Sequence, residues 1–300
     1  MALQKYTKNP ALERVLGRII SDHRSGATQI ARKMLHLIER AGVAVRSPSP
    51  ARRKKIIEDI IDKTIAAHPQ MGILYVLRDE IKSTKILDVP ALHALTRKIT
   101  ADLSKQQENT AMAFAGVIAP KARIITLSFS SAVAAALLRA APKKIEVVIA
   151  ESRPKNEGRV LARTLQQHGV ISTLIVDAAM GLHVPECDVV LLGADAVTPE
   201  FFINKIGSLS LCLLAREYGV PVYVVTDPFR LVNRGKLPRR QINHSAAEII
   251  AGRALFAVDN RYFDFVPLKL VDRIFCNGEI LTVRRLFRIV TGIELRRERK

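Results

Sequence analysis

The sequence contains no tryptophan, and only 5% of its residues are aromatic. Its three cysteines, Cys187, Cys212 and Cys276, lack the spacing of a metal site, and an odd number argues against a disulfide framework. We therefore expect reduced, mostly buried cysteines, no metal and no other cofactor. No apolar run reaches the ~18 residues of a transmembrane helix, and the N-terminus lacks the apolar core of a signal peptide. These absences predict a cytoplasmic protein without membrane contacts.

Positive charge is in excess, with 47 Lys and Arg residues against 28 Asp and Glu residues and a formal net charge of +19. The basic residues are spread over the whole chain and are not interleaved with aromatic residues. Such a charge attracts phosphorylated metabolites, RNA and acidic proteins without specificity. We favour solvated helix faces over a dedicated nucleic-acid site, and RNA stays an alternative partner.

The pattern of apolar residues changes near Pro120. Before it, spacings of three and four predict helices over residues 12–20, 30–38, 56–65 and 92–103. After it, β-branched runs predict strands at 123–128, 145–150, 171–176, 189–192 and 222–226, most of them separated by helical patterns. Strands joined by helices form right-handed βαβ units and a parallel sheet. The predicted fold class is α/β, with a helical N-terminal domain (1–118) followed by a doubly wound parallel-sheet domain (119–300).

Polar turns follow the first two strands of the predicted sheet. Ser130 and Ser131 stand where the first strand gives way to an alanine-rich helix, and hydroxyls there cap free amides at a helix start that also attracts phosphate. Arg153 follows the next strand in Glu-Ser-Arg-Pro, where its guanidinium could bind a phosphate or carboxylate with two hydrogen bonds. A helix cap and a surface salt bridge are the plain structural alternatives.

The strongest signal is Gly193-Ala194-Asp195 followed by Asn204-Lys205-Ile206-Gly207-Ser208. The small residues allow a ligand to approach the backbone, which leaves Asp195 as the carboxylate at the strand exit. The second segment is expected to open the following helix, where Lys205 could hold a phosphate. Because Arg, Lys and one carboxylate stand at successive strand ends, we predict a site for a phosphorylated polyol.

The motifs ESRP, VVLLGADAV, NKIGS, VPVYV and NRYFDFVP occur in that order. They resemble the superfamily of the α, β and δ regulatory subunits of eukaryotic initiation factor 2B, which includes methylthioribose-1-phosphate and ribose-1,5-bisphosphate isomerases. The resemblance covers residues 120–280 closely and the N-terminus loosely. It implies a Rossmann-like C-terminal domain, a homodimer formed through it, and a sugar-phosphate pocket between the two domains. Arg153, Asn204 and Lys205 would hold phosphate and hydroxyl groups, and Asp195 the sugar.

Two departures from the isomerase pattern concern catalysis and substrate binding. The resembling isomerases use a cysteine after the first strand, and Ser128 occupies that position here. Their Arg-Gly-Ala motif, which binds the substrate, corresponds to Arg24, Gly26 and Ala27 with Ser25 inserted. Because the pKa of a serine hydroxyl is far above that of a thiol, Ser128 cannot supply thiol chemistry near neutral pH without an activating base.

We therefore interpret the chain as a cytoplasmic initiation factor 2B subunit-like protein that binds a sugar phosphate or nucleotide-sugar. Whether it is an enzyme stays open. The alternative is an aldose–ketose isomerase acting on a ribose 1-phosphate derivative of the methylthioribose-1-phosphate or ribose-1,5-bisphosphate type, with Asp195 moving a proton and Ser128 replacing the thiol. A third interpretation is a translation-related protein that meets other initiation-factor subunits or RNA through its basic surface.

Overall fold

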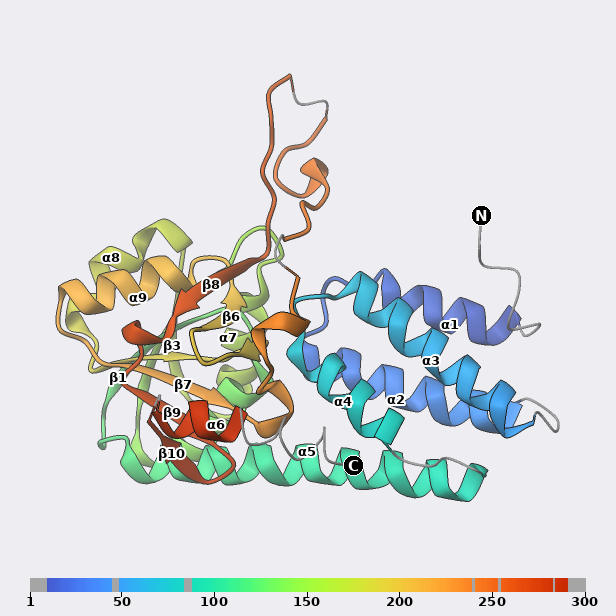
Figure 1. The fold of residues 1–300 in the computed structure, drawn as a ribbon. Helices are drawn as coiled ribbons and strands as arrows, with labels where there is room; N and C mark the ends of the chain where they lie inside the picture. Colours follow the sequence, from blue (N-terminus) through green and yellow to red (C-terminus); the bar gives the residue numbers. More distant parts are fainter. Residues whose placement is uncertain are drawn as a thin grey trace.

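The computed structural model describes residues 10–44, 49–83, 88–238, 241–252, 255–282 and 284–290. Figure 1 shows a helical N-terminal part beside an α/β part, with the long helix α5 (Val89–Val117) running along both. This arrangement confirms the α/β fold class. The expected domain boundary at 118/119 falls between α5 and strand β1 (Arg123–Leu127). It stays a prediction, because α5 contributes to the cores of both parts.

The helical part consists of four helices and the first half of α5. They are α1 (Pro10–Ile20), α2 (Ala27–Ala44), α3 (Pro50–Ala67) and α4 (Gly72–Ser83). Side-chain caps fix two of the starts: Ser49 Oγ accepts from Arg52 N at 3.3 Å, and Asp88 Oδ1 accepts from Ala91 N at 2.8 Å. The sequence patterns predicted four of these five helices. Helix α4 was missed because its first six residues are all buried, so no polar face marks a helical period.

The main sheet has seven strands in the order β10-β9-β7-β4-β1-β2-β3. Neighbours are parallel except for β10, which is antiparallel to β9. The five strands predicted from β-branched runs agree with the observed ones to within one residue at each end. The strands are β1, β2 (Glu146–Ala150), β3 (Ile171–Ile175), β4 (Val189–Leu192), β7 (Val222–Thr226), β9 (Arg273–Cys276) and β10 (Glu279–Leu281).

Helices cover both faces of this sheet. One face packs against α5, α6 (Ser131–Ala140) and α7 (Glu157–Gln167). The other packs against α8 (Met180–His183), α9 (Ser208–Glu217) and the helical residues 284–290. Successive strand residues serve opposite cores, as Ile124 and Ile125 do, because side chains alternate along a strand. Both faces of the central strands are therefore buried, as expected for a doubly wound sheet, whereas the edge strand β3 is largely exposed.

A second, antiparallel sheet joins the two parts of the molecule. It comprises β5 (Ala196–Val197), β6 (Phe201–Lys205) and β8 (Phe263–Pro267). Ala196 and Ile203 pack into the core of the helical part, whereas Val197 and Phe202 pack into the core beneath the main sheet. The expectation that Asn204 and Lys205 open a helix is wrong, because both residues end β6 and α9 begins at Ser208.

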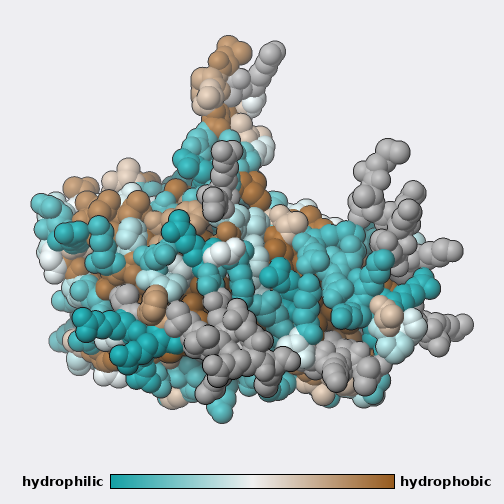
Figure 2. All heavy atoms as spheres, viewed as in Figure 1, coloured by the Kyte–Doolittle hydropathy of each residue, from teal (hydrophilic) through white to brown (hydrophobic). Residues whose placement is uncertain are grey.

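Between β7 and β8 the chain leaves the body of the molecule and returns, as Figure 1 shows. We call residues 241–252 and 255–262 the projecting segment. Leu255 and Phe256 are 88% and 66% exposed, and apolar residues colour the end of this segment brown in Figure 2. Its base is joined to the body by a hydrogen bond from Ile206 N, just after β6, to Tyr262 O at 2.7 Å. The base therefore lies against the body while the end stands in solvent.

The structure also bears on the cysteines and on membrane-spanning helices, which the composition had addressed. The three cysteines are free and buried, as predicted. Burial raises the pKa of Cys212 to about 12, so its thiol stays protonated and chemically inert. None of the helices in the described ranges combines the length and the apolar character that a membrane crossing needs.

Candidate functional site

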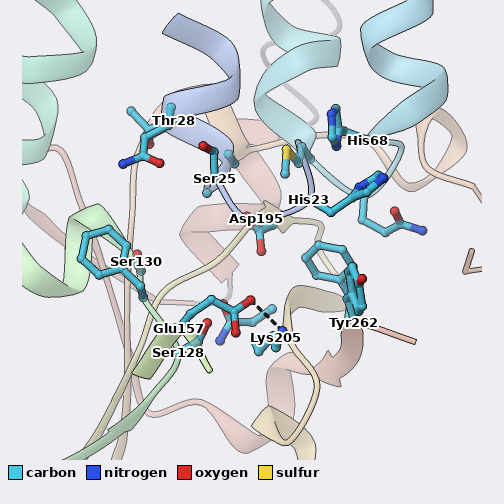
Figure 3. A pocket seen from close by; sticks show the side chains of 18 of the residues that line it. His23, Ser25, Thr28, His68, Ser128, Ser130, Glu157, Asp195, Lys205 and Tyr262 are labelled. Atoms are coloured by element: carbon cyan, nitrogen blue, oxygen red, sulfur yellow. Dashed lines mark hydrogen bonds and ion pairs between the residues drawn. The ribbon is translucent and has the colours of Figure 1, made fainter. Parts of the chain in front are cut away.

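A cavity opens where the helical part meets the carboxyl ends of the main-sheet strands (Figure 3). Its empty volume is about 1000 Å³, including the open mouth. The strand order runs outward in opposite directions from β1 and β4, and a crevice for a ligand forms at such a reversal. The walls come from the loop between α1 and α2, the turn between α3 and α4, the turn after β1, the small sheet and the base of the projecting segment.

Two helix starts converge at one end of the cavity. Ser130 caps α6, with its Oγ accepting from Val133 N at 3.5 Å. The start of α2 lies opposite the start of α6. The hydroxyl of Ser131, in α6, donates to Oγ1 of Thr28, in the first turn of α2, at 3.3 Å. Free amides and aligned peptide dipoles give each helix start a partial positive charge. This end, which we call the helix-start end, is therefore suited to an anion.

Asp22 shapes the loop that brings Arg24 to this end. Its Oδ1 accepts from the backbone N of Arg24 at 3.1 Å and of Ser25 at 3.0 Å, and its Oδ2 accepts from Lys33 Nζ at 2.5 Å. Partial burial raises the pKa of Asp22, but these hydrogen bonds outweigh it and hold the pKa below its ordinary value. Arg24 itself is exposed, and its guanidinium has no protein partner among the described residues.

Gly193 has a role in packing at this end. A Cβ atom at this position would lie 2.5 Å from Ser130 Oγ and 2.7 Å from Ser130 Cβ. The absence of a side chain thus lets the exit of β4 pack directly against the start of α6. From the sequence, we interpreted Gly193 as making room for a ligand. In the structure, the space beside it is occupied by Ser130.

Asp195 lies at the centre of the cavity, between β4 and β5 (Figure 3). Its backbone N donates to Ile203 O at 2.7 Å, and its carbonyl accepts from Gly72 N at 2.8 Å, so the start of α4 holds it in place. Burial raises the pKa of its carboxyl to about 6, with Arg230 and Lys205 lowering it and Glu157 raising it. A carboxyl with this pKa can give or take a proton near neutral pH.

Lys205 and Glu157 form an ion pair beside Asp195. The Lys205 Nζ donates to Glu157 Oε1 at 2.7 Å, drawn as a dashed line in Figure 3. The other carboxylate oxygen of Glu157, Oε2, is buried and has no partner among the described residues. The neighbouring Asn204 donates from Nδ2 to Ser208 Oγ at 2.8 Å. The lysine is therefore already neutralised by a protein carboxylate.

Histidines and a tyrosine form the opposite end of the cavity, which we call the imidazole end. The rings of His244 and Tyr262 stack with centroids 3.5 Å apart, and His23 meets His244 edge-on at 5.2 Å and His68 at 5.6 Å. The Nε2 of His68 lies 2.9 Å from Ile19 O. Burial and the neighbouring His23 lower the pKa of His244 to about 4, so its ring is neutral at physiological pH.

Ser128 follows β1 in the left-handed region, with φ of +63°. Its N donates to Ser152 Oγ at 2.7 Å, and the N of Ser152 donates in turn to Asp177 Oδ1 at 2.7 Å. These bonds join the ends of β1, β2 and β3. They fix the position of Ser128 but bring no histidine to its hydroxyl among the described contacts.

The cavity wall contains nine of the ten site residues predicted from the sequence. Arg153 is the exception. The chain turns at Ser152, both oxygens of Asp177 accept from the backbone N of residues 152 and 153, and the Arg153 guanidinium points away to Ile249 O at 3.3 Å. The roles of the nine residues stay predictions. They are Arg24, Gly26, Ala27, Ser128, Ser130, Ser131, Asp195, Asn204 and Lys205.

Several wall residues were not found from the sequence. They come from five separated parts of the chain, and no local pattern distinguishes them from core histidines, helix starts or turn residues. Only their meeting in space marks them. They are His23, His68, Gln70, Glu157, Arg230, His244 and Tyr262. Among the described residues, no group of three His, Cys, Asp or Glu side chains is arranged to hold a metal ion.

Curated relatives carry two kinds of name. The chain is 37% identical over 141 residues to a ribose 1,5-bisphosphate isomerase of Haloferax volcanii, a match that spans 44% of this chain and 43% of that protein. It is 29% identical over 269 residues to a Pyrococcus abyssi protein named as translation initiation factor eIF-2B subunit 2-like, covering 86% of this chain and 91% of the relative. The first match therefore spans less than half of the isomerase.

The fold has a close counterpart among solved structures. The crystal structure of Pyrococcus horikoshii translation initiation factor eIF-2B matches with a TM-score of 0.80 and 24% identity, covering 91% of this chain and 97% of that one. At this level of identity the likeness shows the fold alone. The model of the initiation factor 2 subunit family matches residues 23–282, which include both ends of the cavity. The chain therefore belongs to the initiation factor 2 subunit family.

Proposed function

We propose that this protein binds a sugar phosphate or nucleotide-sugar in the cavity between its two parts. The observation that carries the proposal is the convergence of the α2 and α6 starts with Arg24 at one end of the cavity. A phosphate there would receive backbone N–H groups, two helix dipoles and a guanidinium. Asp195 and Asn204 would then bind hydroxyl groups of the sugar at the centre. The names of the isomerase relatives support the same class of ligand.

A second candidate function is aldose–ketose isomerisation of a ribose 1-phosphate derivative. Asp195 favours it, because a carboxyl whose pKa lies at about 6 can donate and accept protons during the transfer of hydrogen from C2 to C1. Ser128 speaks against it, since it stands where the resembling isomerases carry a thiol and receives no activating base among the described contacts. Binding is therefore the leading proposal, and catalysis is the alternative.

Partners and location are proposed on family grounds. Members of this family include initiation-factor subunits, and we propose a cytoplasmic homodimer or an assembly with other such subunits. The dispersed charge of +19 supports RNA as an alternative partner but favours no particular surface. Light scattering at micromolar concentration tests the dimer, and a mass of 33.3 kDa alone would contradict it.

The binding proposal is tested by calorimetric titration of the full chain with ribose 1-phosphate. Charge-assisted contacts to phosphate contribute roughly 1.5–3 kcal/mol each, so Arg24→Ala should weaken binding about tenfold or more. Arg153→Ala is the matched control, because that guanidinium points to Ile249 instead of the cavity. Equal losses in both variants, or no loss in Arg24→Ala, would remove the phosphate from the helix-start end.

A further inference from the structure

The cations that line the cavity are unequally available to a ligand. Three Lys and Arg side chains reach its wall: Arg24, Lys205 and Arg230. Lys205 is paired with Glu157 at 2.7 Å, and Arg230 is paired with Asp227 while its Nη2 donates to Thr28 Oγ1 at 2.6 Å. Among the described residues, only Arg24 has a guanidinium or ammonium group in the wall without a carboxylate partner. The cavity thus offers one free positive charge, and it lies at the helix-start end.

The imidazole end lacks a comparable anion site. Lys155 and Lys205 lie near it, 5.3 and 5.1 Å from the Tyr262 ring centroid, but each is already paired with a carboxylate. Lys155 is paired with Glu248, which also accepts from the Tyr262 hydroxyl, and Lys205 is paired with Glu157. Burial lowers the pKa of both His68 and His244, so these rings remain uncharged near neutral pH. Two helix starts lie near these rings. The first N–H of α4 is already bound by the Asp195 carbonyl, and the start of α7 carries the carboxylate of its own first residue, Glu157.

A neutral hydrogen-bond donor is present at the imidazole end instead. Gln70, in the turn between α3 and α4, lines the cavity and is only 3% exposed. Its Nε2 has no partner among the described residues, although buried amide groups in folded proteins are nearly always hydrogen-bonded. An uncharged acceptor on a ligand would satisfy this amide. A phosphate at the same place would be a buried charge without a counter-charge, which is far more costly.

We propose that the cavity selects a sugar monophosphate, with the phosphate at the helix-start end and an uncharged group that carries a hydrogen-bond acceptor at Gln70, and that it rejects sugar bisphosphates. The inference rests on the proposed function, because it names the ligand class of the same cavity. It also separates this chain from its relatives named ribose 1,5-bisphosphate isomerase, since the substrate in that name carries two phosphates.

The test is a calorimetric titration of the full chain at pH 7.5 with ribose 1-phosphate and, separately, with ribose 1,5-bisphosphate. The monophosphate should bind at least about tenfold more tightly, since an unpaired buried charge outweighs the loss of one hydrogen bond. Equal or tighter binding of the bisphosphate would overturn the inference. If both compounds bind and Arg24→Ala weakens both, the proposed function stands even where the preference fails. If neither binds, the proposed function and the inference fall together.

A gain-of-function variant sharpens this test. Gln70→Lys places a cation at the imidazole end and should raise bisphosphate affinity at least tenfold relative to monophosphate affinity. His23→Arg introduces a cation from the less buried loop and serves if Gln70→Lys does not fold. Gln166→Lys, an exposed position on α7, adds the same charge away from the cavity and should leave the ratio unchanged. An unchanged ratio in a folded Gln70→Lys or His23→Arg protein would overturn the inference.

Discussion

The two parts of this molecule contribute to the cavity in different ways. The α/β part supplies residues at strand ends, where parallel ladders and short hydrogen bonds such as Ser128 N to Ser152 Oγ at 2.7 Å hold them. The helical part supplies residues from two connections, the loop around Arg24 and the turn around Gln70. The register of a sheet therefore positions one wall of the cavity, and the caps and ends of helices position the other.

Among the substitutions considered, one at Gly158, in the first turn of α7, should destabilise the α/β part most strongly. A Cβ atom there would lie 2.0 Å from Ala150 O, a backbone atom of β2 that cannot yield. Gly158→Ala should lower the free energy of unfolding by about 3 kcal/mol or more, since overpacking against backbone forces α7 off the sheet. Urea denaturation followed by circular dichroism measures the loss.

Gly116→Ala in α5 is the matched control for that substitution. No atom lies within 4 Å of a Cβ placed there, and alanine is a better helix former than glycine by roughly 0.5–1 kcal/mol. The control should be unchanged or slightly stabilised. A Gly158→Ala protein that unfolds at the same urea concentration as the wild type would show that α7 is not held this closely.

Asp195, where the two walls meet, should make stability depend on pH. Its pKa is 3.8 when unperturbed and about 6 in the folded protein, so the folded state keeps a proton that the unfolded state loses between these values. The contribution of Asp195 to the free energy of unfolding is therefore greatest below pH 4 and falls as the pH rises to about 6. Relative to Asp195→Asn, the wild type should lose on the order of 2 kcal/mol across this window.

Urea midpoints of both proteins, measured from pH 4 to pH 7.5, give this difference directly. The asparagine variant is the control, because it retains the other titrating groups, His68 and His244 included, and their contributions cancel in the difference. A difference that stays constant with pH would mean that the Asp195 carboxyl is solvated in the folded protein.

A smaller effect is expected when a helix N-cap is removed from either part of the molecule. Ser130→Ala removes the cap of α6, and Ser49→Ala removes the cap of α3, so each should cost about 1 kcal/mol in the free energy of unfolding. Only Ser130 lies in the cavity wall, so only Ser130→Ala should also weaken binding of ribose 1-phosphate. Equal affinities in the two variants would separate the α6 start from the ligand site.

The elements of the main sheet could be predicted from the sequence better than those that depend on contacts between distant parts of the chain. The β-branched runs of the main sheet are continuous and local, so β4 and β7 were predicted to the residue. The small sheet was missed because β6 pairs with β8, some sixty residues later in the chain, and its two-residue partner β5 carries no pattern. For that reason Asn204 and Lys205 were predicted at a helix start although they end a strand.

The candidate site divides likewise. Residues at strand exits, such as Asp195, could be predicted because parallel strands end at a common edge. The cluster of His23, His68 and His244 could not, because its members come from three connections whose meeting depends on tertiary packing. Arg153 shows the converse, since its motif predicts a ligand contact but the turn at Ser152 directs the side chain outward.

Helix α5 has a consequence for how a ligand could enter. Its first half, with Leu92 and Ile99, belongs to the core of the helical part, whereas Phe114 near its end belongs to the core of the α/β part. At 1.5 Å per residue, its 29 residues span roughly 44 Å without a break. Because this continuous helix is anchored in both cores, the two parts cannot rotate about a hinge without bending α5. A ligand would therefore enter through local movements at the rim of the cavity.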